Sequence, residues 1–110
     1  MTLRSFLLAG AATVSLALPA AADCNKVTFS DVGWTDITAT TAVTTTVLQA
    51  LGYETDIKLL SVPVTYSALS SGDVDVFLGN WMPSMEADLA PYRDDGTVET
   101  LRTNLVGAKY

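Results

Sequence analysis

The sequence KVTFSDVGWTDITATTAVTTTVLQALG, residues 26–52, decides the fold, because the pattern of a strand passes directly into that of a helix. Its first part, Lys26–Ser30, places the apolar Val27 and Phe29 between polar residues, which is the two-residue period of a β-strand. Gly33 then marks a short loop before the helical part begins. The stretch therefore predicts a strand–loop–helix unit, from which alternating α/β folds are built.

The second part of this stretch predicts a helix that runs to about Leu51. Thr35 or Asp36 offers an N-cap side chain, and Gly52 supplies the residue at which the helix stops. Six of the residues between positions 38 and 46 are threonines, which are poor helix formers, so tertiary packing has to hold the helix. The predicted packing face consists of Val43, Val47, Ala50 and Leu51.

The alternation of strand and helix continues along the chain. Tyr53–Leu60 alternates like a half-exposed strand, and Pro63 opens a short helix that ends near Ser70. Val74–Leu78 is mostly apolar and is predicted to be a buried central strand, and Pro83–Tyr92 is predicted to be a short helix interrupted by Pro91. This β-α-β-α-β order predicts an open, mostly parallel sheet. Weaker strand candidates follow at Val98–Leu101 and Leu105–Tyr110.

Composition excludes several classes of function. The 110 residues allow one domain of ordinary size, and they include one Cys and no His. This excludes a His-ligated zinc site, a Ser-His-Asp triad and a disulfide within the chain. A net charge of −6, with six basic residues that form no cluster, argues against binding to nucleic acid. No acidic calcium-type loop is present either, so no metal or cofactor is predicted.

Residues 1–22 have the pattern of a secretory signal peptide. Arg4 is followed by an apolar run from Phe6 to Leu18 and by small residues that allow cleavage after about Ala22. An uncleaved anchor or a buried core helix is the alternative, although the run is shorter than the roughly 20 residues that span a bilayer. The pattern predicts a periplasmic protein, in which Cys24 is either buried and free or has its partner outside this chain.

Two tryptophans occupy the loops in which ligands of parallel sheets bind. Trp34 follows the first predicted strand and Trp81 follows the third. Gly33 precedes Trp34 directly and Gly79 lies two residues before Trp81, and each glycine lets the backbone bend. Aromatic faces turned to a common point form a cage for a quaternary ammonium, each contributing about 0.5–2 kcal/mol. The alternative is that both indoles simply pack across the top of a small core.

Asp36 lies two residues after Trp34, at the start of the predicted helix. A helix N-terminus repels a cation, so a cation site there needs a carboxylate to reverse the local charge. Asp36 can do this, or it can act as a plain N-cap, and the two roles are compatible. No residue pattern indicates catalysis, because no His is present to act as a base.

Five motifs carry a resemblance to a known family: FSDVGWTDITATTA (29–42), LGYET (51–55), SVPVTY (61–66), DVFLGNWMP (75–83) and LVGAKY (105–110). With them the chain strongly resembles the periplasmic choline-binding proteins, which are the substrate-binding subunits of choline ABC importers within the wider glycine betaine and quaternary amine family. The resemblance covers essentially all of residues 24–110, and its GWTD and GNWMP motifs are specific.

The resemblance implies a two-lobe fold that closes around its ligand at a hinge. It also implies an aromatic box around the trimethylammonium group, with an acidic residue contributing. Matched motif by motif, these roles come to Trp34, Asp36, Trp81 and Tyr110, and only the resemblance points to Tyr110. Two lobes need roughly 100–150 residues each. The resemblance therefore implies that residues 23–110 are the N-terminal part of the substrate-binding domain, a truncated first lobe. It also implies that the second lobe and the partner of Cys24 are missing from this sequence.

We therefore expect a solute-binding subunit, not an enzyme, that captures choline and delivers it to the permease and ATPase of an ABC importer at the membrane. Asp36 favours choline over glycine betaine, because it would repel the betaine carboxylate. Three alternatives remain open: a glycine betaine-binding homologue, a fragment that binds nothing, and an exported enzyme on the same fold. The enzyme would need Asp36 or Glu86 as its general acid or base.

Overall fold

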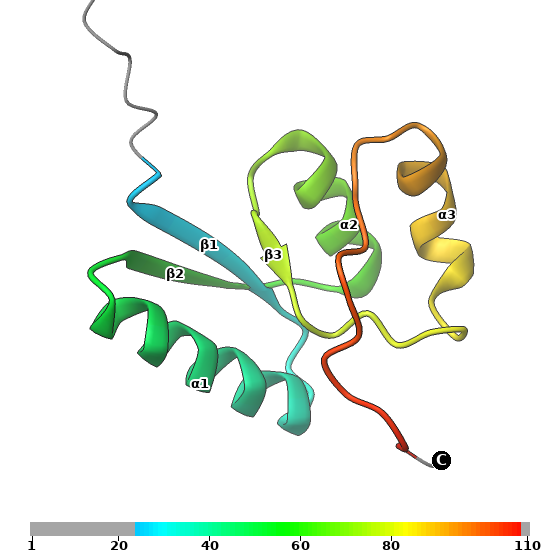
Figure 1. The fold of residues 1–110 in the computed structure, drawn as a ribbon. Helices are drawn as coiled ribbons and strands as arrows, with labels where there is room; N and C mark the ends of the chain where they lie inside the picture. Colours follow the sequence, from blue (N-terminus) through cyan, green and yellow to red (C-terminus); the bar gives the residue numbers. More distant parts are fainter. Residues whose placement is uncertain (1–23, 109–110) are drawn as a thin grey trace, which may run out of the picture.

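The computed structural model describes residues 24–108, which form an α/β unit of alternating strands and helices (Figure 1). The predicted signal peptide and Tyr110 lie outside the described residues. Cys24 is exposed, which excludes the first of its two alternatives, a buried free thiol. The elements in chain order are β1 (Lys26–Asp31), α1 (Thr35–Ala50), β2 (Glu54–Leu59), α2 (Val62–Ser71), β3 (Val76–Phe77) and α3 (Glu86–Asp94).

The sheet is open and parallel, as predicted, with the strand order β2-β1-β3. However, β1 is the central strand and β3 lies at an edge with only two residues, whereas the sequence predicted a buried central strand over 74–78. Just before β3, the Asp75 carboxylate accepts the Thr28 N–H at 2.7 Å and the Asp75 N–H donates to the Thr28 carbonyl at 2.8 Å. The edge strand β2 was predicted to be half-exposed, but even its apolar residues Ile57 and Leu59 are exposed.

Helix α1 packs on the sheet through a face that the sequence did not predict. Its buried residues are Ile37, Thr41 and Thr45, while Val43 and Val47 are 66% and 54% exposed. The 4-residue spacing places the buried three on one face. Burial of Thr45 is possible because its hydroxyl bonds to its own helix, donating to the Thr41 carbonyl at 2.9 Å. Threonine then packs almost like valine.

Helix α2 contributes buried residues to the core. Pro63 stands in its first turn, as predicted, and the helix ends after Ser71 at Gly72, which has φ 79°. Its buried Thr65 shares a 2.6 Å hydrogen bond with Ser30 of β1, so the strand and the helix are joined by a buried polar pair as well as by apolar contacts. The buried apolar core consists of Phe29, Ile37, Tyr66, Val74, Met85 and Leu89.

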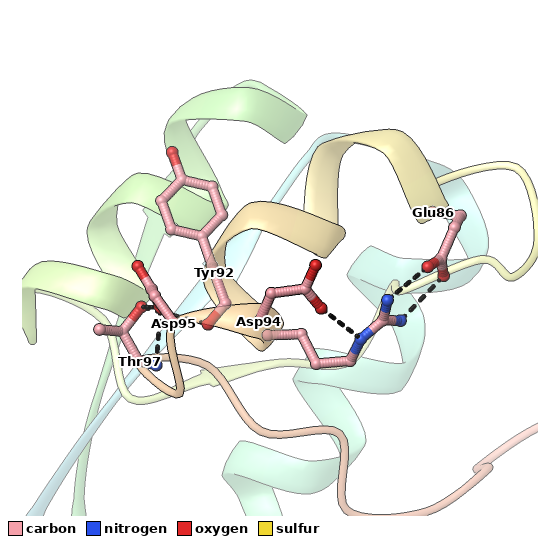
Figure 2. Close-up of polar contacts among 6 residues, drawn as sticks. Glu86, Tyr92, Asp94, Asp95 and Thr97 are labelled. Carbon is pink, nitrogen blue, oxygen red and sulfur yellow. Dashed lines mark hydrogen bonds and ion pairs between the residues drawn. The ribbon is translucent and has the colours of Figure 1, made fainter.

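Helix α3 is short and continues through Pro91, which the sequence predicted would interrupt it. The helix has only nine residues, and proline removes a single hydrogen bond near its end. On its surface the Arg93 guanidinium bonds to both carboxylate oxygens of Glu86 and lies 3.6 Å from Asp94 (Figure 2). The hydrogen bond to Arg93 is the main reason why the pKa of Glu86 is lowered.

A turn after α3 directs the chain back across the molecule. The Asp95 carboxylate accepts both the N–H and the hydroxyl of Thr97, at 2.9 and 2.6 Å, and these bonds lower the pKa of Asp95 (Figure 2). Beyond it, residues 98–108 run past β3 without regular structure, so the weaker strand predictions are wrong over the part that is described. Their apolar side chains are largely exposed and no strand of residues 24–108 pairs with them. Among residues 24–108, no helix is long and apolar enough to cross a membrane.

Candidate functional site

The loop after β1 is held by a buried carboxylate. Asp31 accepts the Gly33 N–H at 2.8 Å with one oxygen and the Thr38 hydroxyl at 2.8 Å with the other. Gly33 has φ 78°, a conformation that residues with a side chain rarely adopt. The next residue, Trp34, accepts the Thr38 N–H at 2.8 Å through its carbonyl and so occupies the N-cap position of α1. Asp31 therefore fixes the backbone that carries Trp34.

This geometry corrects the predicted cap of α1. The N-cap is Trp34, without a side-chain cap bond, and not Thr35 or Asp36. Asp36 lies in the first turn of the helix, where a negative charge is favoured by the positive end of the helix dipole. Its side chain is exposed, and the structure gives no cap bond that would occupy its carboxylate.

The loop after β3 is held from the protein interior. The Trp81 N–H lies 3.1 Å from the Met85 sulfur, and the Trp81 carbonyl accepts the Met85 N–H at 2.9 Å. Beside Trp81, the Asn80 side-chain oxygen accepts a 2.6 Å hydrogen bond from the Tyr66 hydroxyl. Unlike Gly33, Gly79 does not have a positive φ. It is needed for space, because a Cβ there would lie 2.8 Å from the Phe77 ring.

A cavity of about 360 Å³ lies between the N-terminal part of α1, the loop after β3 and the segment after α3. It is lined by Asp36, Ile37 and Thr40 of α1, by residues 78–83, and by residues 100, 102–105, 107 and 108. The structure therefore brings Asp36 and Trp81 to one cavity. Trp34 is 41% exposed and is not among the lining residues, and Tyr110 lies outside the described residues.

The wall of the cavity carries charges of both signs. Asp36 brings a carboxylate, and Arg102, from the irregular segment after α3, brings a guanidinium. The Asn104 side chain donates a 3.0 Å hydrogen bond to the Leu78 carbonyl and so ties this segment to the end of β3. The cavity can therefore accept a cation beside Asp36 and Trp81, while Arg102 opposes it or attracts an anionic group of the same ligand.

A second cavity, of about 400 Å³, shares Arg102 with the first as a lining residue. Apolar side chains from α2, β3 and α3 dominate its wall, and it contains none of the predicted site residues. Nor do any three His, Cys, Asp or Glu side chains among residues 24–108 converge where a metal ion could be held. The first cavity is therefore the candidate site.

Sequence reasoning missed the residues that hold the two loops. For Asp31 a local signal existed, because an Asp two residues before a Gly at the end of a strand is typical of an Asx turn. For Tyr66, Asn80 and Met85 there was none, because these contacts join α2 to a loop and a helix that are distant in the chain.

Comparisons with known proteins agree with the fold. Residues 25–110 match the OpuAC family, described as the substrate-binding domain of the ABC-type glycine betaine transport system. An uncharacterized protein, ORF1, of Chromohalobacter salexigens is 54% identical over 90 residues, which are 82% of this chain and 58% of that protein.

Two solved structures are also similar. An ABC-transporter choline-binding protein in complex with choline is 74% identical, with a TM-score of 0.65, over 66% of this chain and 25% of that one. A choline-binding protein in an unliganded, semi-closed conformation is 72% identical, with a TM-score of 0.72, over 77% of this chain and 30% of that one. The chain thus spans a quarter to just under a third of these solved chains. Because the family match covers most of its length, the chain belongs to the family of substrate-binding domains of ABC-type glycine betaine transport systems.

Proposed function

We propose that this chain is part of a solute-binding protein that captures choline and delivers it to the permease and ATPase of an ABC importer. The observation that carries the proposal is the cavity that Asp36 and Trp81 share. The 74% identical protein whose structure holds choline supports the choice of ligand. Export to the periplasm, with cleavage after about Ala22, belongs to the same proposal and rests on the pattern of residues 1–22.

The chemistry of a trimethylammonium group explains these residue types. It carries a full positive charge but no N–H, so a protein recognises it by aromatic faces and a nearby carboxylate. Trp81 supplies such a face on the cavity wall, and Asp36 supplies the charge. We propose that Trp34 and Tyr110 complete the aromatic box, as the resemblance implies, when the ligand is bound. Trp34 is exposed next to the cavity-lining turn of α1 and is thus free to contribute.

Glycine betaine is the second candidate ligand, and a specific observation favours it. Arg102 lines the same cavity, and a guanidinium pairs well with the carboxylate that betaine has and choline lacks. Asp36 acts in the opposite sense, because it repels that carboxylate. Titration calorimetry with both ligands decides between them. We expect choline to bind more tightly, and an Arg102→Ala variant to weaken only the binding of betaine.

Substitutions test the site itself. We expect Trp81→Ala and Asp36→Asn each to weaken choline binding, by about tenfold or more for the indole, which is about 1.4 kcal/mol. Matched controls lie away from the cavity: Tyr53→Ala removes an exposed aromatic ring and Asp56→Asn an exposed carboxylate. Both controls should bind choline normally. Unchanged affinity for choline in the two site variants would contradict the proposal.

A further inference from the structure

We propose that Tyr66 is a positioning residue for the ligand site: its buried hydroxyl holds Asn80 and Met85 on the two sides of Trp81 and thereby orients the indole. The inference rests on the proposed function for its effect on choline, but its structural half can be tested without any ligand.

The contacts converge on one short loop. The Tyr66 hydroxyl donates to the Asn80 side-chain oxygen at 2.6 Å and lies 3.5 Å from the Met85 sulfur. The same sulfur lies 3.1 Å from the Trp81 N–H. One hydroxyl from α2 therefore touches the residue before Trp81 and the residue that anchors the Trp81 backbone. Trp81 itself lines the cavity.

The ring and the hydroxyl of Tyr66 have separate tasks. The ring packs edge-on against Phe77, with centroids 6.0 Å apart, and is stacked with Tyr92 at 6.3 Å. A phenylalanine could make both contacts. The side chain is 1% exposed, and a buried hydroxyl is costly unless it is hydrogen-bonded. What the hydroxyl adds over a phenylalanine is thus its bond to the loop. Burial also raises the pKa of Tyr66 to about 12, so the phenol remains a donor at neutral pH.

The first test reads Trp81 alone. In a Trp34→Phe background Trp81 is the single tryptophan, and quenching of its fluorescence by acrylamide reports how firmly it is held. We expect Tyr66→Phe to increase the quenching constant. The matched control is Tyr92→Phe, which removes the hydroxyl of the stacked ring and leaves the loop contacts intact. It should change nothing. Circular dichroism verifies that each variant is folded.

The second test links the hydroxyl to the loop and to choline. With Trp34 present, Tyr66→Phe should weaken choline binding about two- to tenfold, the worth of one hydrogen bond. Asn80→Ala should do the same from the other end of the bond. The double variant should lose no more affinity for choline than the single variant with the larger loss, because both substitutions remove the same interaction.

The outcomes separate the two proposals. If Tyr66→Phe leaves Trp81 quenching at the level of the Tyr92→Phe control, or if the two losses of affinity simply add, the positioning role is overturned. If the starting protein binds no choline, the proposed function fails, while the quenching measurement still decides whether Tyr66 holds Trp81.

Discussion

Replacing Gly79 by alanine should damage both the fold and the ligand site. The added Cβ would lie 2.8 and 2.9 Å from two carbons of the Phe77 ring and 2.9 Å from the Ile37 side chain. Carbon atoms prefer separations of about 3.5–4.0 Å, so the loop or its neighbours must move by roughly 0.5–1 Å. Ile37 is buried in the core and the Phe77 ring packs on Tyr66, so neither can move freely. Overpacking of this kind typically costs about 1–3 kcal/mol.

The same displacement reaches the cavity, because Gly79 and Ile37 both line it and Trp81 follows two residues later. We expect Gly79→Ala to lower the free energy of unfolding in urea by that amount and to weaken choline binding about tenfold. Gly96→Ala is the control. Gly96 has φ 78° but open space around it, so alanine there adds strain of about 1–2 kcal/mol without steric overlap. Wild-type stability and affinity in Gly79→Ala, or an equal loss of affinity in Gly96→Ala, would refute the reasoning.

Three further changes test other parts of the structure. Asp31→Ala removes two hydrogen bonds from the loop after β1 and should lower the free energy of unfolding by about 1–3 kcal/mol in urea denaturation. Burial, and then Asp88, raise the pKa of Tyr66 to about 12, so the folded state holds this proton more tightly than the unfolded state. The resulting stability, on the order of 2–3 kcal/mol at most, is present below pH 10 and should be lost as the pH rises from 10 through 12 in urea titrations. Tyr66→Phe should remove this pH dependence. The buried hydroxyl of Thr41 has no hydrogen-bond partner among residues 24–108, so Thr41→Val should raise the melting temperature. Thr45→Val loses bonds to helix carbonyls and should gain less.

The sequence predicted the elements well and their environments less well. The strand β1, the helix α2 and the parallel sheet follow from local signals: alternation, a proline in the first turn and a glycine at the end. The face on which α1 packs does not, because a hydrophobicity pattern favours Val43 and Val47. It cannot recognise that Thr45 satisfies its own hydroxyl within the helix and can be buried.

The candidate site was predictable to the extent that topology alone determines it. The carboxyl ends of parallel strands meet at one edge of a sheet, and this rule predicted that the loops bearing Trp34 and Trp81 would converge. In the structure Trp81 lines the cavity together with Asp36 from the first turn of α1. It could not predict that Trp34 would lie outside the cavity lining, nor that Arg102 would come to the same wall from an irregular segment. Such placements depend on turns and side-chain bonds, for example those of Thr97 and Asn104, that have no periodic signal.

The charges around the cavity determine which residue contributes most to binding. A helix N-terminus is equivalent to about half a positive charge, and Arg102 adds another positive group to the wall. Both offset Asp36, whose carboxylate is exposed, and in water a pair of unit charges 4 Å apart gains only about 1 kcal/mol. The half-buried indole of Trp81 is not offset in this way, because its attraction comes from the ring face and from displaced water. We therefore expect Trp81→Ala to weaken choline binding more than Asp36→Asn in calorimetry at physiological salt. The reverse order would mean that charge, and not the aromatic face, holds the ligand.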